Sequence, residues 1–333
     1  MKKYSETLFD NSKKFLKLET KNKLKSLLKL LGFKYIIYNF IYFFLSKIIK
    51  SKNYFLKGVV FDTLKHTNEL TIVKGNFNEK FILFTNDNVI SKEMFINGKF
   101  DLTKLEKTLE FLKEKKIKTI YDIGANIGTI CIPAIKRGLI ENAFAVEPEK
   151  RNFELLKLNI SLNNLEDKIV SHNYALSNKD DEFVEMEIAP DNYGDHRIKN
   201  KVNFNIHGEE DRKTVKVKTK KFDTLFKNVN PLNNLVWMDT QGYEPVILSG
   251  ANNLINSKTP LVLEFWPYAL KRAGLWEKML EDLKNFDYYV DLSEQKLSAI
   301  KINENAILEL QNGWDNELKG SYSLYKDLIL LKE

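Results

Sequence analysis

The apolar run at residues 117–123 most constrains the fold, because it passes directly into a turn that contains Gly124 and Gly128. Apolar residues at helical spacing follow this turn, and the same order of a short apolar run and a helical pattern recurs along the chain. Further runs lie at residues 142–148, 168–174, 235–239 and 261–265. Strands that alternate with helices form βαβ units and a parallel sheet, so we predict an α/β fold.

The composition is that of a folded globular protein, with 43% hydrophobic and 29% charged residues over 333 positions. Cys131 is the single cysteine and has no partner for a disulfide, which is typical of a reducing compartment. No secretory signal pattern of charged start, apolar core and small-residue cleavage site opens the chain. These features predict a cytoplasmic protein in which Cys131 serves packing.

The positive charge is concentrated toward the N-terminal end. Residues 1–57 hold fourteen lysines and three acidic residues, a charge of +11, so the other residues sum to −4. A nucleic-acid groove in the main domain would need the basic residues there instead. The distribution therefore predicts no nucleic-acid partner and favours a local surface partner such as anionic lipid or a phosphorylated glycan carrier.

Within this basic segment, residues 35–45 are nearly all apolar and are flanked by lysines. The run is shorter than the roughly 20 residues that span a bilayer, and its polar positions recur at helical spacing. We predict a helix with a broad apolar face. Two interpretations stay open: the helix packs on the main domain or in a dimer interface, or residues 25–52 make a peripheral contact with the inner face of a membrane.

Three regions are predicted along the chain. Residues 1–57 form the basic amphipathic segment, and residues 58–106 form a small cap or linker with two short β-rich runs. Residues 107–333 form the main domain. Between its third and fourth strands lies an insertion at residues 178–221, whose two ends have strand-like patterns.

Ligand-binding residues of an open α/β sheet lie at the carboxyl ends of the strands. Asp122, at the first of these ends, can bind an ammonium group but would repel a pyrophosphate. Asn126 stands where a dinucleotide fold needs its second glycine. At the next strand end Glu147 can accept both hydroxyls of a ribose, and Ala175 follows the third strand beside a place for an adenine ring. An adenosine-containing cofactor fits these positions, and NAD is disfavoured.

Five motifs in a fixed order carry a resemblance to a known family. They are DIGANIG, AVEP, NYALS, MDTQGYEPVILSGA and LEFWP, between residues 119 and 270. In order and spacing they resemble the FkbM family of methyltransferases. The resemblance implies a Rossmann-like methyltransferase fold with a mostly parallel seven-stranded sheet, S-adenosylmethionine as cofactor and, commonly, an O-methyl acceptor on a sugar or a polyketide. It does not extend to residues 1–57.

Carried over position by position, the resemblance implies a cofactor site. The glycine turn would border the methionine end, and Glu147 would bind the ribose. The predicted cofactor-binding residues are Asp122, Gly124, Ala125, Asn126, Gly128, Glu147, Pro148, Ala175 and Asp239. The chain departs from the commoner family pattern at Gln241, where many members have glutamate. No residue is assigned to a metal ion.

The insertion supplies most of the predicted contacts to a small-molecule or glycan acceptor. Tyr193, His196 and Arg197 combine an aromatic ring, an imidazole and a basic fork, which suit a sugar or its phosphate. Gln241 and Glu244 complete the predicted set. A solvated loop without catalytic duty is the alternative for the insertion, and stabilisation of a helix N-terminus is the alternative for Glu244.

Methyl transfer to a hydroxyl asks for a general base. Asp239 is the first candidate, because a strand end fixes its position. His196 has an ordinary pKa better matched to the task, and Glu264 is a carboxylate on a strand that is otherwise apolar. We predict O-methylation of a hydroxyl on a sugar, glycan or glycolipid precursor.

Two other classes of function stay open at this stage. A non-catalytic cofactor- or glycan-binding protein at a membrane surface would use the basic segment, and an NAD-dependent oxidoreductase is the less favoured alternative. A nucleic-acid methyltransferase that acts on an exocyclic amine would carry a polar-Pro-Pro-aromatic motif where this chain has residues 239–242. The sequence does not determine the acceptor, a metal requirement or the oligomeric state.

Overall fold

The computed structural model describes residues 40, 43, 54–200, 209, 211–227, 233–315 and 325–333. The chain divides into two compact units, Met1–Val60 and Phe61–Glu333. The predicted helix at residues 35–45 and nearly all of the basic segment lie outside the described residues. Across the described part of the chain, no helix has both the length and the apolar character that a membrane span requires.

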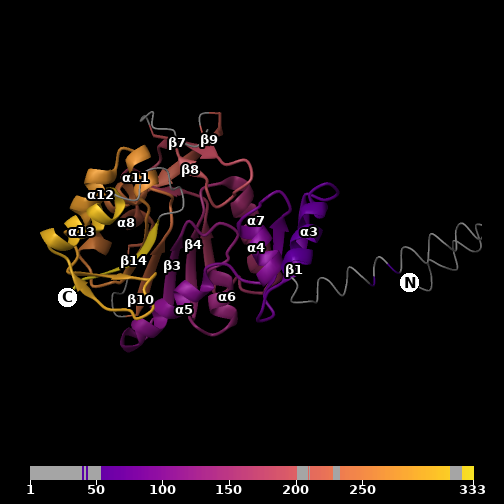
Figure 1. Ribbon diagram of the computed structural model, residues 1–333, viewed down its shortest axis with the longest axis horizontal. Helices are drawn as coiled ribbons and strands as arrows, with labels where there is room; N and C mark the ends of the chain where they lie inside the picture. Colours follow the sequence, from indigo (N-terminus) through magenta and orange to yellow (C-terminus); the bar gives the residue numbers. More distant parts are fainter. Residues whose placement is uncertain are drawn as a thin grey trace, which may run out of the picture. The chain divides into compact units, whose positions relative to one another are not determined.

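An eight-stranded sheet forms the centre of the second unit (Figure 1). Its strands, in spatial order, are β13 (Ile300–Lys301), β12 (Tyr288–Asp291), β14 (Lys326–Leu331), β11 (Leu261–Phe265), β10 (Asn234–Met238), β3 (Thr119–Ile123), β4 (Asn142–Val146) and β5 (Ile169–His172). β13 and β14 run antiparallel to their neighbours, and the other strands share one direction. The expectation of seven strands was wrong by one, because two-residue β13 is too short to leave a periodic pattern.

Helices cover both faces of this sheet, so its central strands β3, β10 and β11 are buried on both sides. Neighbouring residues of β3 point to opposite cores, Ile120 to one and Tyr121 to the other. The core around Ile120 includes residues of α5 (Leu102–Phe111), α6 (Cys131–Lys136) and α7 (Lys150–Leu162). The core around Tyr121 includes residues of α9 (Glu244–Leu248), α10 (Asn252–Ile255), α11 (Pro267–Arg272), α12 (Trp276–Leu283) and α13 (Glu304–Asp315).

The remaining elements lie before the main sheet or inside the insertion. Before it come α3 (Tyr54–Leu64), β1 (Leu70–Lys74), β2 (Lys80–Phe84), α4 (Ile90–Asn97) and the 3-10 helix η1 (Lys113–Lys115). After β5 come β6 (Ala175–Leu176), β7 (Phe183–Ile188), β8 (Arg197–Ile198), β9 (Lys213–Lys220) and α8 (Phe222–Leu225). The two β-rich runs of the predicted cap are β1 and β2, which pair as an antiparallel hairpin.

Side chains of α7 hold the outer edge of this hairpin. Asn159 accepts a hydrogen bond from Ile82 N (2.7 Å) and donates to Ile82 O (3.2 Å). One turn later, Asn163 makes the same pair of bonds with Lys80 (2.9 and 2.7 Å). The two amides satisfy backbone groups that an edge strand would otherwise expose, so the hairpin is fixed to the main sheet's helical layer.

Helix α6 is shorter than the sequence pattern suggests. The apolar helical spacing begins at Ile127, but the helix begins only at Cys131, because Asn126 and Gly128 adopt left-handed backbone angles (φ 50° and 91°). Pro133 therefore lies in the first turn, where an N–H has no partner within the helix.

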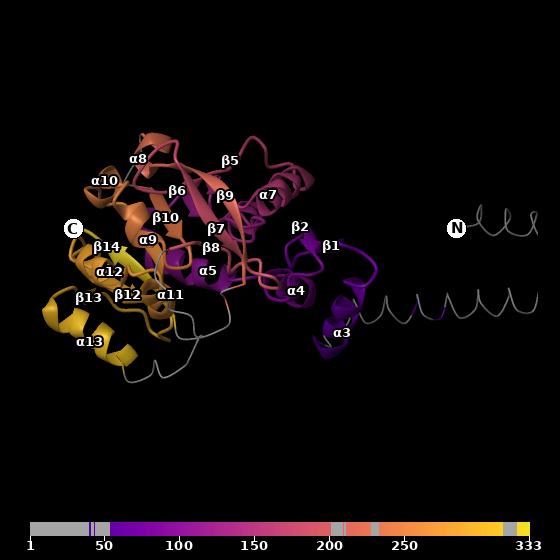
Figure 2. The ribbon, with the colours of Figure 1, turned by 90° about the horizontal axis from the view of Figure 1, so that it is seen from above.

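The insertion forms a small sheet in place of a loop. Its strands lie in the order β6-β9-β7-β8 and are seen side by side in Figure 2. The two predicted strand-like ends are β7 and β9, which pair antiparallel along their length. Between β7 and β8 the chain touches the glycine turn, since Asn126 Nδ2 donates to Tyr193 O (2.8 Å). The insertion thus borders the carboxyl ends of the main strands.

Candidate functional site

The glycine turn after β3 passes unusually close to the end of β10. Gly124 has φ of 91°, and a Cβ placed on it would lie 1.9 Å from the carbonyl oxygen of Asp239. Only glycine allows both this backbone angle and this approach. The turn therefore brings the Asp122 and Asp239 strand ends together at one edge of the sheet.

Gly124→Ala is expected to destabilise the protein more than a matched glycine variant does, by about 1–3 kcal/mol. The reason is that the alanine Cβ forces β3 and β10 apart. Gly138→Ala is the match: Gly138 also has a positive φ (71°), but its Cβ would meet nothing within 4 Å. Urea unfolding of the two variants measures the difference. Equal losses of stability would show that the close approach at Gly124 has no energetic importance.

Two clefts open at this edge. The first holds about 550 Å³ of space, part of it open to solvent. Its polar wall comes from the strand ends and the insertion: Asn126, Glu147, Asn152, Tyr193, His196, Asp239, Thr240 and Gln241. Its largely apolar wall comes from Pro148, Tyr174, Ala175, Leu176, Met186, Ile198, Tyr243 and Ile247.

The second cleft, of about 450 Å³, opens on the side of α4 and α5. The two clefts share four lining residues, Gly124, Asn126, Gly194 and Asp239. Residues that line only the second cleft are Ile90, Phe100, Asp101, Asp122, Ala125, Thr129, Ile130 and Trp237. A ligand that extends past Gly124 would therefore reach both clefts.

Asp122 is a buried carboxylate with unused hydrogen-bonding capacity. Its side chain is 1% exposed, and its Oδ2 atom has no hydrogen-bond partner among the described residues. Burial raises the pKa of Asp122 to about 7. A buried acceptor without a partner is costly, and an ammonium group in the second cleft would satisfy it.

Glu147 is held rigidly at the end of β4. Its two carboxyl oxygens accept hydrogen bonds from Asn126 N (2.9 Å) and Glu149 N (2.8 Å). Burial raises the pKa of Glu147 to about 8, against these two bonds, which favour the carboxylate. Each carboxyl oxygen can accept a second bond, so Glu147 can still take ribose hydroxyls from the first cleft.

Asp239, at the junction of the clefts, belongs to a buried group of acids. The side-chain amide of Gln241 donates to Asp239 Oδ1 (2.6 Å) and to Glu264 Oε2 (2.9 Å). Burial and the neighbouring Asp239 carboxylate raise the pKa of Glu264 well above its usual range, whereas burial raises that of Asp239 only to about 6. Near neutral pH the pair therefore carries its negative charge on Asp239.

Glu244 is the first residue of α9 and is fully buried. Its Oε1 atom accepts hydrogen bonds from Thr240 N (2.8 Å) and the Thr240 hydroxyl (2.9 Å). It lines neither cleft. The geometry therefore places Glu244 as a support for the loop after β10, and the predicted contact with substrate is not seen.

His196 lines the first cleft but is unsuited to accept a proton there. Its Nδ1 atom accepts a hydrogen bond from Ala189 N (3.1 Å), so the neutral ring carries its proton on Nε2. Burial lowers the pKa of His196 to about 4. The expectation that its pKa suits general-base catalysis was wrong, because the ring is buried, and His196 can serve as a hydrogen-bond donor.

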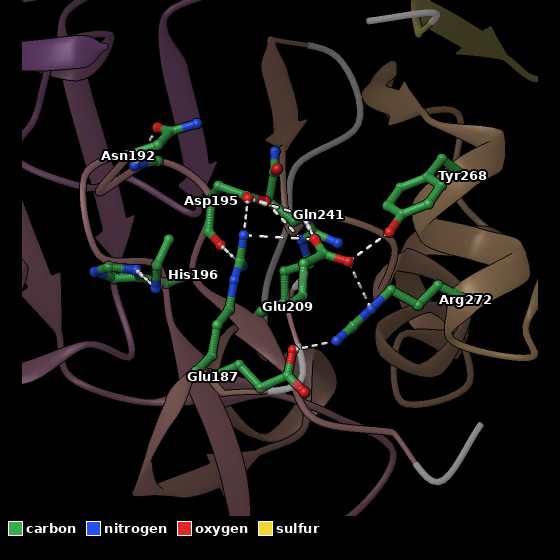
Figure 3. Close-up of polar contacts among 12 residues, drawn as sticks. Glu187, Asn192, Asp195, His196, Glu209, Gln241, Tyr268 and Arg272 are labelled. Atoms are coloured by element: carbon green, nitrogen blue, oxygen red, sulfur yellow. Dashed lines mark hydrogen bonds and ion pairs between the residues drawn. The ribbon is translucent and has the colours of Figure 1, made fainter. Parts of the chain in front are cut away.

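Arg197 lies in a buried ion network and lines neither cleft. Its guanidinium binds Asp195 through Nε (2.5 Å) and Nη2 (2.8 Å), and Nη2 also pairs with Glu209 (2.6 Å). Figure 3 shows that Glu209 also meets Tyr268 and Arg272 of α11. Arg212 and Glu187 complete the network. The predicted acceptor contact of Arg197 is therefore replaced by a structural one between the insertion and α11.

The clefts bring together most of the predicted site. Of the predicted cofactor-binding residues, only Gly128 lines neither cleft. A Cβ placed on Gly128 would clash with the side chains of Ile132 and Leu156. Of the acceptor set, Tyr193, His196 and Gln241 line the first cleft. Sequence reasoning missed Met186 and Ile198 in the apolar wall of the first cleft and the Ile90, Phe100 and Asp101 side of the second. Those residues carry no motif and are joined only by folding.

The family model described as the methyltransferase FkbM domain matches residues 122–290, just over half of the chain. The matched segment begins at Asp122 and includes both Glu147 and the loop after β10. A comparison with curated proteins found no match.

Many solved structures are similar to this chain. A methyltransferase FkbM from Methylobacillus flagellatus KT is 15% identical over 65% of this chain and 44% of that one, with a TM-score of 0.37. The M. jannaschii TYW2 in complex with AdoMet is 13% identical over 80% and 86%, with a TM-score of 0.39. The Pyrococcus abyssi tRNA (uracil-54, C5)-methyltransferase in complex with S-adenosyl-L-homocysteine is 11% identical over 79% and 44%, with a TM-score of 0.37. The alignment thus spans less than half of the first and third structures.

Proposed function

The chain belongs to the FkbM family of methyltransferases, and on that premise we propose that it transfers a methyl group from S-adenosylmethionine to a hydroxyl of a sugar, glycan or glycolipid precursor. One observation carries the choice of a hydroxyl. Asp239 stands where the two clefts meet, with a pKa near 6, where a carboxylate can take a proton near neutral pH.

The residues at the clefts fit the cofactor. The unpartnered Asp122 Oδ2 suits the ammonium of the methionine end, and Glu147 suits the ribose. The apolar wall around Ala175 and Ile247 suits an adenine ring. Because Gly124 lines both clefts, one ligand can extend from the first cleft into the second.

When bound, S-adenosylmethionine supplies a methyl group on a positively charged sulfur, and methylation of a hydroxyl releases one proton. Asp239 is placed to accept that proton. Gln241 donates a hydrogen bond to Asp239 Oδ1, which orients the carboxylate at the junction of the clefts. Fixed orientation of this kind can lower a barrier by several kcal/mol. Tyr193 and His196 line the first cleft from the insertion.

The test of the cofactor site is calorimetry with S-adenosylhomocysteine. Asp122→Ala and Glu147→Ala are each expected to weaken its binding by at least about 1–3 kcal/mol, because each variant leaves buried polar groups of the ligand unpaired. Glu154→Ala is the control, since Glu154 lies on the exposed side of α7 and lines neither cleft. Wild-type affinity in both folded site variants would refute the assignment.

A further inference from the structure

One part of the wall of the second cleft, made by Ile90, Phe100, Asp101 and Trp237, has the character of an acceptor subsite. Ile90 is the first residue of α4, Phe100 and Asp101 lie between α4 and α5, and Trp237 lies on β10 next to the reacting edge. We propose, on the premise of the methyl transfer above, that this wall binds the acceptor and that the acceptor is a sugar without phosphate or other anionic groups near the methylated hydroxyl.

The charges around the second cleft exclude an anionic acceptor. Asp101 and Asp239 line the acceptor side of it, Asp122 lines the side assigned above to the ammonium group of the cofactor, and among the described residues no lysine, arginine or histidine lines it. Lys104 is the cation beside Asp101, and it is paired with Asp101 (3.2 Å) and Asp327 (2.7 Å). A phosphate would therefore meet like charges at short range, which disfavours its binding. Neutral hydroxyls and an amino group would find acceptors instead.

The shape of the wall suits a sugar ring. Phe100 and Trp237 supply aromatic surface and Ile90 an aliphatic one, while Asp101 can accept hydroxyl groups. Such a combination of apolar walls with few polar groups is typical of small-molecule sites.

The buried network around Arg197 supports the same conclusion. The sequence predicted that the guanidinium of Arg197 contacts a sugar or its phosphate, but Asp195 and Glu209 neutralise its charge. It also lines neither cleft. The acceptor wall before residue 102 lies outside residues 122–290, which the family model matches.

The experiment follows tritiated methyl transfer from S-adenosylmethionine by the full chain to three sets of probes: neutral methyl hexosides, hexosamines and hexose 6-phosphates. We expect label on members of the first two sets, and rates at least about tenfold lower for the phosphates. Phe100→Ala and Asp101→Asn should raise the KM for a labelled sugar about fivefold or more, as expected from one lost contact. Asparagine tolerates the left-handed backbone angle of Asp101 (φ 49°), and the affinity for S-adenosylhomocysteine should stay unchanged in both variants.

Charge-reversal variants distinguish a local effect of Asp101 on the acceptor from a general effect of charge on the protein surface. Asp101→Lys should improve transfer to the phosphates relative to the neutral sugars, whereas Glu110→Lys should not, because Glu110 is an exposed residue of α5 away from the clefts. Faster labelling of phosphates by the wild type, equal effects of the two lysine variants, or no labelled sugar from a chain that binds S-adenosylhomocysteine would overturn the proposal. A chain that binds no S-adenosylhomocysteine would instead overturn the methyltransferase mechanism itself.

Discussion

Asp239→Asn is expected to lower turnover by at least about 10²-fold while the affinity for S-adenosylhomocysteine is largely kept. The variant preserves the shape of the side chain but removes the group that accepts the proton. Burial raises the pKa of Asp239 to about 6, so the base is ionised above that pH. Wild-type turnover should therefore rise with pH through about 6, and the residual rate of the variant should lack this limb.

Turnover is measured as label transferred to whichever sugar the wild type methylates. Asp181→Asn is the control, because Asp181 is an exposed aspartate of the insertion that pairs with surface lysines. Near-normal turnover in Asp239→Asn together with an inactive His196→Ala would assign the base to the insertion. Full activity in both variants would remove general-base catalysis from the mechanism.

Arg197→Met is expected to destabilise the protein by about 3–5 kcal/mol, the typical effect of removing one partner from a buried ion pair. Arg197 is 2% exposed and pairs with Asp195 and Glu209, which are 2% and 3% exposed. Without the guanidinium, two carboxylates remain buried with reduced compensation. The measurement is the free energy of unfolding in urea, and the loss should come with little change in the m-value.

The control for this prediction is Lys218→Met, on β9 of the same insertion. Lys218 pairs with Asp181 at 2.7 Å, but both side chains are about half exposed, and such surface pairs contribute about 0–1 kcal/mol. A loss below 1 kcal/mol for Arg197→Met would show that the network is not what holds the insertion against α11. Arg197→Met should also disturb the first cleft, because His196, which lines that cleft, immediately precedes Arg197 in the chain.

Residues whose role depends on local chain geometry could be predicted from the sequence. Asp122, Gly124 and Glu147 sit at strand ends or in the turn that follows, and the carboxyl ends of parallel strands meet at one edge in every sheet of this kind. The apolar runs also predicted the central strands, because strands buried on both faces leave a continuous hydrophobic pattern. The antiparallel direction of β13 and β14 could not be predicted from such a pattern.

The roles of charged residues in the insertion depended on burial, which the sequence does not encode locally. Arg197 and His196 have the chemistry of ligand-binding residues, but Asp195, Glu209 and the backbone of Ala189 occupy their polar atoms. Burial then lowered the pKa of His196, which the sequence suggested would titrate near neutrality. A side chain's partners come from segments distant in sequence, so these assignments needed the folded structure.

The sequence by itself therefore determined the α/β core, the family and the strand ends that line the clefts, because each follows from short-range periodicity or from a motif of adjacent residues. Only the tertiary structure decided how the second cleft is built. Phe100 and Asp101 reach Trp237 and Asp239 across more than 130 residues of chain. Contacts of that separation are set by the packing of α4 and α5 against the sheet, and packing leaves no signal in the spacing of single residues.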